Sequence, residues 1–140
     1  MVYVDTSVLV ALYTHEVKSV DVSRWYESVK AELVSVAWCV SEFASALSIK
    51  QRTGQIDAPS ALHAWKQFER FCANDLRLLP VDHGTFHRAA VLALDATTSL
   101  RAGDALHVAS ALEIKAKRIA TLDGVMEANA KRLKLKTETI

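Results

Sequence analysis

The sequence has little cysteine, no long hydrophobic run and almost no net charge, and each shortage excludes a class of protein. Its two cysteines, Cys39 and Cys72, lie far apart and lack the CxxC or Cys/His spacing of a metal site. Both fall in apolar helical patterns, which predicts buried, reduced thiols rather than a disulfide. No apolar run approaches the roughly 20 residues that span a bilayer, and no signal peptide precedes the first predicted strand. We therefore expect a cytoplasmic protein that does not enter the membrane.

The formal net charge of +1 excludes a strongly basic coat protein for nucleic acid. The charge is nevertheless unevenly distributed along the chain. Residues 1–114 carry 10 basic and 13 acidic side chains, a net of −3, whereas residues 115–140 carry 7 basic and 3 acidic ones, a net of +4. This basic C-terminal segment has the charge to contact phosphates. We slightly favour the simpler interpretation, a solvated surface with lysines in the last turns of helices.

Half of the sequence, 51%, is hydrophobic, which is enough for the core of one domain over residues 1–140. Short β-branched runs alternate with stretches of helical spacing, in which apolar residues recur three and four positions apart. Because helices separate the strands, the strands need crossover connections and form a mostly parallel α/β sheet of four or five strands, covered by helices on both faces. The predicted strands are Val2–Val4, Leu33–Val36, Leu78–Val81, Arg118–Leu122 and, as an optional fifth, Leu135–Glu138.

Two kinds of residue add detail to this fold. Pro80 cannot donate a ladder hydrogen bond, which places the third strand at a sheet edge. The larger aromatic side chains recur at core spacings, so we interpret them as packing residues before base-stacking surfaces. They are Trp25, Trp38, Trp65 and Phe68.

Four carboxylates lie near the carboxyl ends of the predicted strands, where open parallel sheets bind ligands. Asp5 ends the first strand, and Asp123 ends the fourth. Glu42 lies near the start of the helix after the second strand, and Asp104 lies in the first turn of its own helix. Taken singly, the aspartates are explained as helix caps or first-turn acids. Four such acids at one edge, with Glu42 interrupting an apolar segment, instead predict a shared site.

A cluster of like charges needs a cation to stay ionised. Mg²⁺ prefers carboxylate and water oxygens, and usually takes only one or two carboxylates directly. One such ion, or two roughly 4 Å apart, activates water and stabilises the leaving oxygen in phosphodiester cleavage. No Ser, Cys or His nucleophile presents itself. The residues therefore predict a magnesium-dependent nuclease whose metal-binding and catalytic groups are Asp5, Glu42, Asp104 and Asp123.

The segments around these acids also carry a family resemblance. In order along the whole chain, they resemble the PIN-domain family, above all the VapC-type toxins of type II (VapBC) toxin–antitoxin modules. The segment around Asp104 is the most specific of the four, and the other three convince only together. The segments are Asp5-Thr6-Ser7-Val8-Leu9, Ser41-Glu42-Phe43, Leu100-Arg101-Ala102-Gly103-Asp104-Ala105-Leu106-His107 and Thr121-Leu122-Asp123.

The resemblance implies a sheet ordered 3-2-1-4-5 and a Mg²⁺- or Mn²⁺-dependent endoribonuclease. By position, Asp5 and Asp104 match the direct metal ligands of the family, and Glu42 and Asp123 match its further acids. Hydroxyl side chains that would hold these acids in place occur at Thr6, Ser7 and Thr121.

The same resemblance implies partners. Family members form homodimers and are inhibited by a VapB-type antitoxin whose C-terminal segment enters the active-site groove. The aromatic-rich faces of Val22–Val29 and Leu62–Cys72 offer surface for such contacts, since sizeable apolar patches usually mark interfaces. The alternative is that these faces belong entirely to the core.

Several other polar residues have simpler interpretations. Asp82 follows a strand, but Asp82-His83-Gly84-Thr85 is more typical of a helix cap than of a fifth ligand. His83 and His87 have the spacing of a zinc pair without a third ligand, which favours surface histidines. His107 is predicted to be a partly buried helix histidine, with a metal or phosphate contact as the alternative. For Arg101, a phosphate contact and a solvated loop position remain equally open.

Other functions also remain open. A structure-specific DNA nuclease uses related acids, although a chain of 140 residues leaves little room for DNA-gripping elements. A receiver-like phosphorylated signalling module would accept phosphate at Asp82, but it needs paired acids after the first strand and a lysine after the last. A nuclease fold used only for binding would not require four acids.

Overall fold

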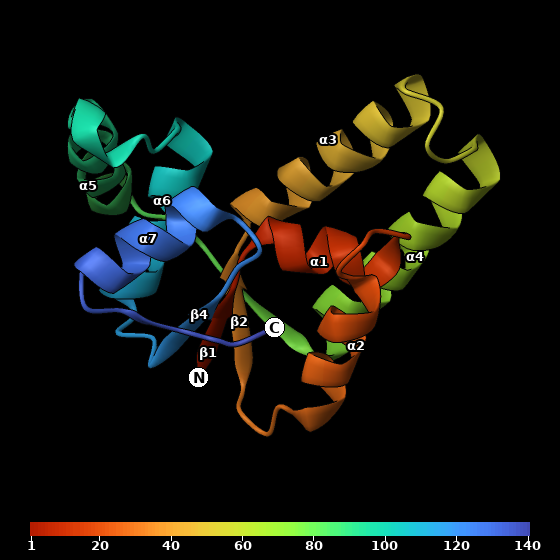
Figure 1. Ribbon diagram of the computed structural model, residues 1–140, viewed down its shortest axis with the longest axis horizontal. Helices are drawn as coiled ribbons and strands as arrows, with labels where there is room; N and C mark the ends of the chain where they lie inside the picture. The colour runs from red at the N-terminus through yellow and green to blue at the C-terminus, as the bar shows by residue number, and fades with distance from the viewer.

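A five-stranded parallel sheet forms the centre of the computed structural model, which describes residues 1–140 (Figure 1). The strand order is β3-β2-β1-β4-β5, and every neighbouring pair is parallel. This arrangement confirms the predicted α/β class and the order implied by the resemblance. The strands are β1 (Val2–Val4), β2 (Leu33–Val36), β3 (Leu76–Leu79), β4 (Arg118–Ala120) and β5 (Lys136–Thr137).

The strand boundaries correct the sequence prediction in three places. β3 lies two residues earlier than predicted, so that Pro80 follows the strand directly instead of lying within it. The edge position is confirmed, because β3 pairs only with β2. β5 is shorter than predicted, and β4 ends at Ala120. Residues 121–123 therefore leave the sheet and are free to project beyond its edge.

Helices connect all the strands. They are α1 (Thr6–Tyr13), α2 (Ser19–Ser28), α3 (Trp38–Arg52), α4 (Ala58–Asn74), α5 (His83–Leu94), the short 3₁₀ helix η1 (Ala96–Thr98), α6 (Ala102–Glu113) and α7 (Gly124–Arg132). The cap predicted at Asp82 is confirmed, since its Oδ1 accepts a hydrogen bond from Thr85 N at 2.7 Å. Gly54 follows α3 with a left-handed φ of 75°, which glycine adopts without strain. None of these helices has the length and apolar character of a transmembrane span.

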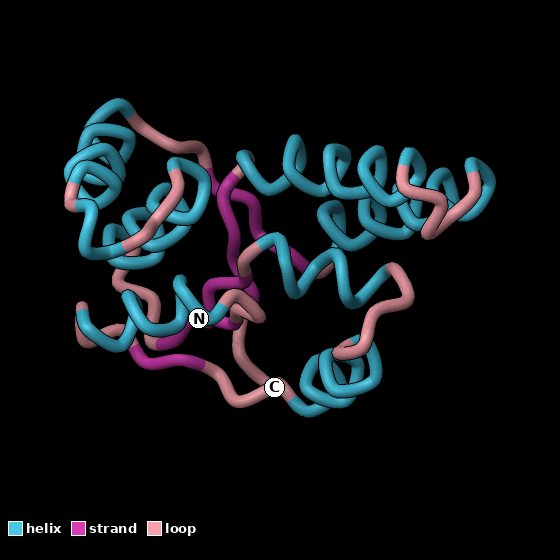
Figure 2. Tube along the Cα trace, turned by 45° about the horizontal axis from the view of Figure 1, so that its top comes forward, coloured by secondary structure: helices cyan, strands magenta, loops and turns pink.

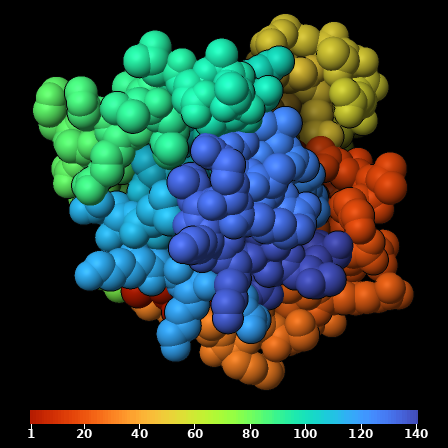
Figure 3. Space-filling model, turned by 60° about the vertical axis from the view of Figure 1, so that its left-hand side comes forward, coloured from red at the N-terminus to blue at the C-terminus, as the bar shows by residue number.

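The helices form two layers, one on each face of the sheet (Figures 1 and 2). Helices α1–α4 pack on one face around a core that includes Val4, Phe43 and Phe68. Helices α5–α7 pack on the other face around Tyr3 and Ile119. Because successive strand residues point to opposite faces, the neighbours Tyr3 and Val4 contribute to different cores. In the space-filling view, α5 and the C-terminal residues occupy the same face of the molecule (Figure 3).

Most of the residues predicted to pack in the core do so. Trp25 and Phe68 are buried, and Trp65 is partly buried against the first core. The predicted thiols are also confirmed, since Cys39 is buried, Cys72 is partly buried, and both are free. Trp38 was wrongly predicted as a core residue, because its side chain lies at the first position of α3 and is 41% exposed.

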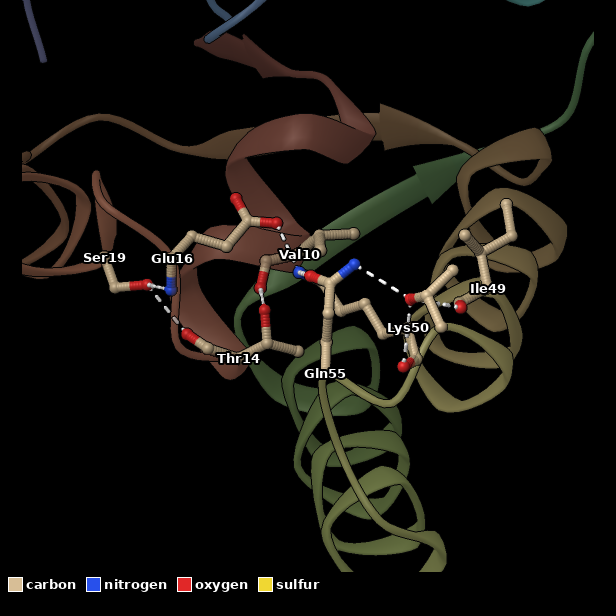
Figure 4. Close-up of polar contacts among 8 residues, drawn as sticks. Val10, Thr14, Glu16, Ser19, Ile49, Lys50 and Gln55 are labelled. Atoms are coloured by element: carbon tan, nitrogen blue, oxygen red, sulfur yellow. Dashed lines mark hydrogen bonds and ion pairs between the residues drawn. The ribbon is translucent and has the colours of Figure 1, made fainter.

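A buried lysine holds the α1–α2 connection against the end of α3 (Figure 4). Lys50 is only 9% exposed. Its Nζ lies 2.8 Å from Glu16 Oε1 and donates to Gln55 Oε1 at 3.4 Å. A buried ammonium group needs such partners, because leaving it unpaired costs much of its lost hydration energy. The ion pair therefore fixes the connection that leads away from α1.

We predict that Glu16→Gln destabilises the protein more than Lys50→Met does. The first change leaves a buried charge without its counter-charge, whereas the second removes the charge and keeps the apolar stem. We expect a loss of about 1–2 kcal/mol for Glu16→Gln, less than the about 3–5 kcal/mol of fully buried pairs, because the Glu16 side chain is 33% exposed. Urea denaturation measures both, and an equal or larger loss for Lys50→Met would contradict the prediction.

Candidate active site

The carboxyl ends of β1 and β4 place two aspartates at the same edge of the sheet. The strands pair directly, with Val4 opposite Ala120. Asp5 follows β1 and caps α1, and Asp123 caps α7, accepting a hydrogen bond from Met126 N at 2.8 Å. Each aspartate is thus a helix cap, as its simplest interpretation predicted. Because they lie at the same edge of the sheet, the two capping carboxylates are also placed to contribute to one site.

Asp5 is held firmly through one oxygen only. Its Oδ1 accepts hydrogen bonds from Ser7 N and Ser7 Oγ, both at 2.6 Å. The other oxygen, Oδ2, is buried and has no hydrogen-bond partner. Burial raises the pKa of this carboxyl group, although nearby His107 and the hydrogen bonds from Ser7 counteract the rise. An unpartnered buried carboxylate oxygen is costly unless a cation or proton satisfies it.

Asp104 adds a third carboxylate to the same region. It lies in the first turn of α6 and is half-buried. Burial raises its pKa, and the negative charges of Asp123 and Asp5 raise it further. Asp104 therefore lies close enough to Asp5 and Asp123 for their charges to act on it. Their repulsion makes the metal-free site unfavourable at neutral pH.

Glu42 lies beside this cluster but has partners of its own. Its Oε2 accepts a hydrogen bond from Thr6 Oγ1 at 2.5 Å and lies 2.5 Å from His107 Nε2. Burial raises the pKa of Glu42, but the contacts with His107, Thr6 and Trp38 outweigh it and hold the pKa below its usual value. Glu42 is consequently an oriented, ionised carboxylate.

The histidine that orients Glu42 belongs to a buried chain of polar groups. Tyr3 OH lies 2.8 Å from His107 Nδ1 on the far side of the ring. A neutral imidazole that accepts from Tyr3 at Nδ1 donates from Nε2 to Glu42, which satisfies every group in the chain. His107 is 1% exposed, so the prediction of a partly buried residue underestimated both its burial and its contact with an acid. Its only sequence signal was its position one turn after Asp104.

The side chains of Glu42 and Trp38 reach from α3 to Gly103, the residue before Asp104. A Cβ atom at Gly103 would lie 2.8 Å from Glu42 Oε1 and 3.3 Å from Trp38 Nε1. The first distance is shorter than real Cβ contacts, so a larger residue at this position would displace the Glu42 carboxylate from its present place. Sequence reasoning singled out Asp104 in this segment and missed the role of the residue before it.

The three predicted hydroxyl residues all lie against the acids. Thr6 contacts Glu42 and Ser7 contacts Asp5, as described above. Ser7 Oγ also accepts a hydrogen bond from Leu122 N at 2.9 Å, which ties the segment after β4 to the start of α1. Thr121 Oγ1 accepts a hydrogen bond from Asp123 N at 3.0 Å. These hydroxyl groups connect two strand ends and hold the acids on both.

The donor set suits a hard divalent cation. Asp5 Oδ2 offers a free buried oxygen, and Asp104 and Asp123 offer carboxylates whose mutual repulsion a cation relieves. The side chains do not form a ready cluster of three or more His, Cys, Asp or Glu ligands. Magnesium does not require one, because it usually keeps several water ligands.

Other candidate residues lie outside this cluster. The Asp82 carboxylate is used in capping α5, and His83 and His87 are exposed on that helix. Arg101 is exposed at the start of α6. In the basic C-terminal segment, Arg118 pairs with Glu138 and Lys131 with Glu127. Asp5, Asp104 and Asp123 therefore lie near one another and Glu42 lies beside Gly103, whereas these other candidates are at the surface.

Comparison with known proteins agrees with this arrangement. The model of the PIN-domain family matches residues 2–132. The chain belongs to the PIN-domain family. Members of this family are typically metal-dependent nucleases. No curated protein matches the sequence significantly.

Solved structures of toxin proteins share the fold of this PIN domain. VapC20 of Mycobacterium tuberculosis, described as a toxin that cleaves the sarcin–ricin loop, is 17% identical with a TM-score of 0.75, and the match covers 92% of this chain and 95% of that one. FitAcB of Neisseria gonorrhoeae is 16% identical with a TM-score of 0.73, and the match covers 99% of this chain and 97% of that one. VapBC2 of Rickettsia felis, bound to a promoter DNA fragment, is 13% identical with a TM-score of 0.63. The match covers 99% of this chain and 98% of that one.

We predict that Asp104→Asn stabilises the metal-free protein. The raised pKa of Asp104 means that the folded state binds its proton more tightly than the unfolded state. Its contribution to stability is therefore lost as pH rises from the unfolded pKa through the folded pKa, and the ionised group is destabilising at pH 7. The variant should melt a few degrees higher in chelator at pH 7, and this gain should vanish in acid. The exposed acid Glu69, changed to Gln, serves as control; a lower melting temperature for Asp104→Asn would refute the repulsion.

We predict that glutamine replaces His107 better than asparagine does. The Gln amide reaches the position of Nε2 and can still donate to Glu42, whereas the shorter Asn amide reproduces only Nδ1. Groups that orient metal-site ligands typically contribute about 10–100-fold to metal affinity or activity. We expect His107→Asn to lose that factor in Mn²⁺ affinity and His107→Gln to keep most of it. Equal affinities in two variants of equal melting temperature would show that the Glu42 contact is unimportant.

Proposed function

We propose that this PIN domain is a metal-dependent endoribonuclease and the toxin of a VapBC-type toxin–antitoxin module. The observation that carries the proposal is the unpartnered, buried Oδ2 of Asp5, placed within reach of the charges of Asp104 and Asp123 at the carboxyl edge of the sheet. A catalytically idle domain would gain stability by losing these charges. Residues 1–140 would act as a single nuclease domain in the cytoplasm.

The four acids would have different roles in the site. Asp5 and Asp104 would hold Mg²⁺ or Mn²⁺, and Asp123 would complete the negative surface opposite them. A divalent cation at such a site activates water and neutralises charge on the phosphodiester. Glu42, kept ionised and oriented by His107 and Thr6, accepts hydrogen bonds and so positions water at the edge of the cluster. Thr121 and Ser7 keep Asp5 and Asp123 from turning away.

RNA is the favoured substrate over DNA. The fold of VapC20, a toxin that cleaves RNA in the sarcin–ricin loop, is reproduced over nearly the full length of both chains, and this chain adds no element for gripping a duplex. A receiver module is excluded as an alternative, because receivers have the strand order 2-1-3-4-5 and this sheet has 3-2-1-4-5. The partners that we propose are an antitoxin peptide, in which a basic side chain reaches the acids, and a second copy of the chain. Neighbours of the same fold include a toxin–antitoxin complex from Klebsiella pneumoniae.

We predict that purified protein cleaves single-stranded RNA in Mg²⁺ or Mn²⁺ and that Asp5→Asn lowers the rate by orders of magnitude. The variant keeps the shape of the side chain and the Ser7 contact but loses the charge that binds the cation. Cleavage of a labelled RNA is compared with that of DNA of the same sequence, with circular dichroism confirming the fold. Undiminished cleavage by Asp5→Asn, or cleavage in excess chelator, would refute the proposed site, and faster cleavage of DNA would reassign the substrate.

A further inference from the structure

An apolar pocket of about 260 Å³ lies directly beside the acid cluster. It is formed where the start of α3 meets α5 and the first turns of α6. Trp38, Phe86 and Leu106 line it together with alanines of α5 and α6 and with Gly103. Pockets for drug-sized ligands usually exceed about 300 Å³, so this one suits a single small ring system. Almost no hydrogen-bonding group faces its interior, which selects a ligand that binds by its flat apolar face.

The two aromatic rings of the pocket are exposed, unlike most aromatic side chains of the chain. Trp38 is 41% exposed and Phe86 is 51% exposed, whereas Phe43 and Phe68 in the core are at most 1% exposed. Leaving large aromatic surface in water forgoes the energy that burial would supply. Exposed aromatic rings around a pocket are the usual surface on which a base stacks.

The pocket lies next to the acids, because Gly103 and Trp38 line it and also lie beside Asp104 and Glu42. Gly103 lines the pocket and immediately precedes Asp104. A Cβ atom at Gly103 would contact both Glu42 Oε1 and Trp38 Nε1, so the glutamate carboxylate and the indole meet at this point. Trp38 and Glu42 also lie one turn apart on α3. A ligand that places a phosphate at the acids therefore places its neighbouring group at the mouth of the pocket.

We propose that this pocket binds one nucleobase of the RNA substrate, stacked on Trp38 and Phe86, next to the phosphate that is cut. The inference rests on the proposed nuclease function and adds to it the form of the substrate. A base reaches the pocket only after leaving its own helix, so the site selects single-stranded or looped RNA. Because the lining offers no hydrogen bonds to the edges of a base, the pocket does not distinguish bases by sequence. It favours the bases that stack most strongly.

The test combines pocket variants with an altered substrate. Phe86→Leu keeps an apolar side chain of similar size and removes the ring, whereas Phe86→Tyr keeps the ring. Neither touches the acids. Val91→Ala, at an exposed position on α5 outside the pocket, is the matched control. The substrate is a single-stranded RNA with one cleavage position, used intact and with an abasic residue on either side of that position.

We expect Phe86→Leu to raise KM for the intact RNA by about 5- to 100-fold, the range of one lost base stack, with kcat little changed. Phe86→Tyr keeps the ring and should raise KM much less than Phe86→Leu does, and Val91→Ala should behave like the wild type. An abasic residue at one flanking position should raise KM of the wild type by a similar factor and should have no further effect in Phe86→Leu, because the same contact is already lost. The pocket does not bind a base if the effects of Phe86→Leu and of the abasic residue on KM multiply, or if an abasic residue at neither position changes KM. In both cases the nuclease function still stands.

Two further outcomes separate the inference from its rivals. Quenching of Trp38 fluorescence by RNA in chelator reports binding without cleavage, with Trp38→Leu as the reference. Quenching in a protein that cleaves nothing would support the pocket and refute the nuclease function. α5 also exposes Leu94 at 85% beyond the pocket, which gives a second copy of the chain a surface to cover. If light scattering shows a dimer that Phe86→Leu and Leu94→Ser both dissociate, the pocket belongs to the subunit interface and the proposal is overturned.

Discussion

The half-satisfied carboxylate of Asp5 is the constraint on which the rest of this edge of the molecule depends. One oxygen caps α1 through Ser7, which fixes how that helix leaves β1. The same serine accepts a hydrogen bond from Leu122 N, so the segment after β4 is held to the start of α1. The second oxygen is buried with no partner. Folding therefore buries a carboxylate that no protein group neutralises. The free energy lost by removing it from water is offset by the packing of the two hydrophobic cores.

The acids around Asp5 divide into an oriented one and a repelling pair. Glu42 is fixed by Thr6 and His107, which lower its pKa despite burial. Asp104 has no comparable side-chain donor, and its pKa is raised by burial and by neighbouring carboxylates. This difference matches a division of labour, because an ionised acid with fixed geometry positions water, while acids that repel one another gain most from a cation. The buried contact between Tyr3 and His107 connects the fixed side of the site to the core between the sheet and α6.

Much of this arrangement was predictable because it depends on local patterns. The strands are short apolar runs, and Asp5 and Asp123 come soon after β1 and β4, so the meeting of these two acids at one edge comes from the geometry of a parallel sheet. The order of the strands came from the family resemblance, and Pro80 alone supported the edge position of β3. The end of β3 was misplaced because Pro80 was assigned to the strand, whereas pairing stops at Leu79 directly before it. His107, Gly103 and Trp38 were undervalued because their roles arise from side-chain contacts between α3 and α6, which no spacing within either helix reveals.

The first turns of α3 also explain why an acid and an aromatic ring lie at the same place, next to Gly103 of α6. Trp38 opens α3 where the helix leaves the sheet, so its side chain has no strand to cover and remains at the surface. Glu42 lies one turn further along the same helix, and side chains four apart share a face. A rigid helix thus sets the separation between the aromatic surface and the acid. The ends of both side chains lie next to Gly103, and Asp104 follows Gly103 directly in the first turn of α6. A nucleotide held by its base on one side and its phosphate on the other would then be positioned by regular secondary structure, which loses less entropy on binding than a site built on mobile loops.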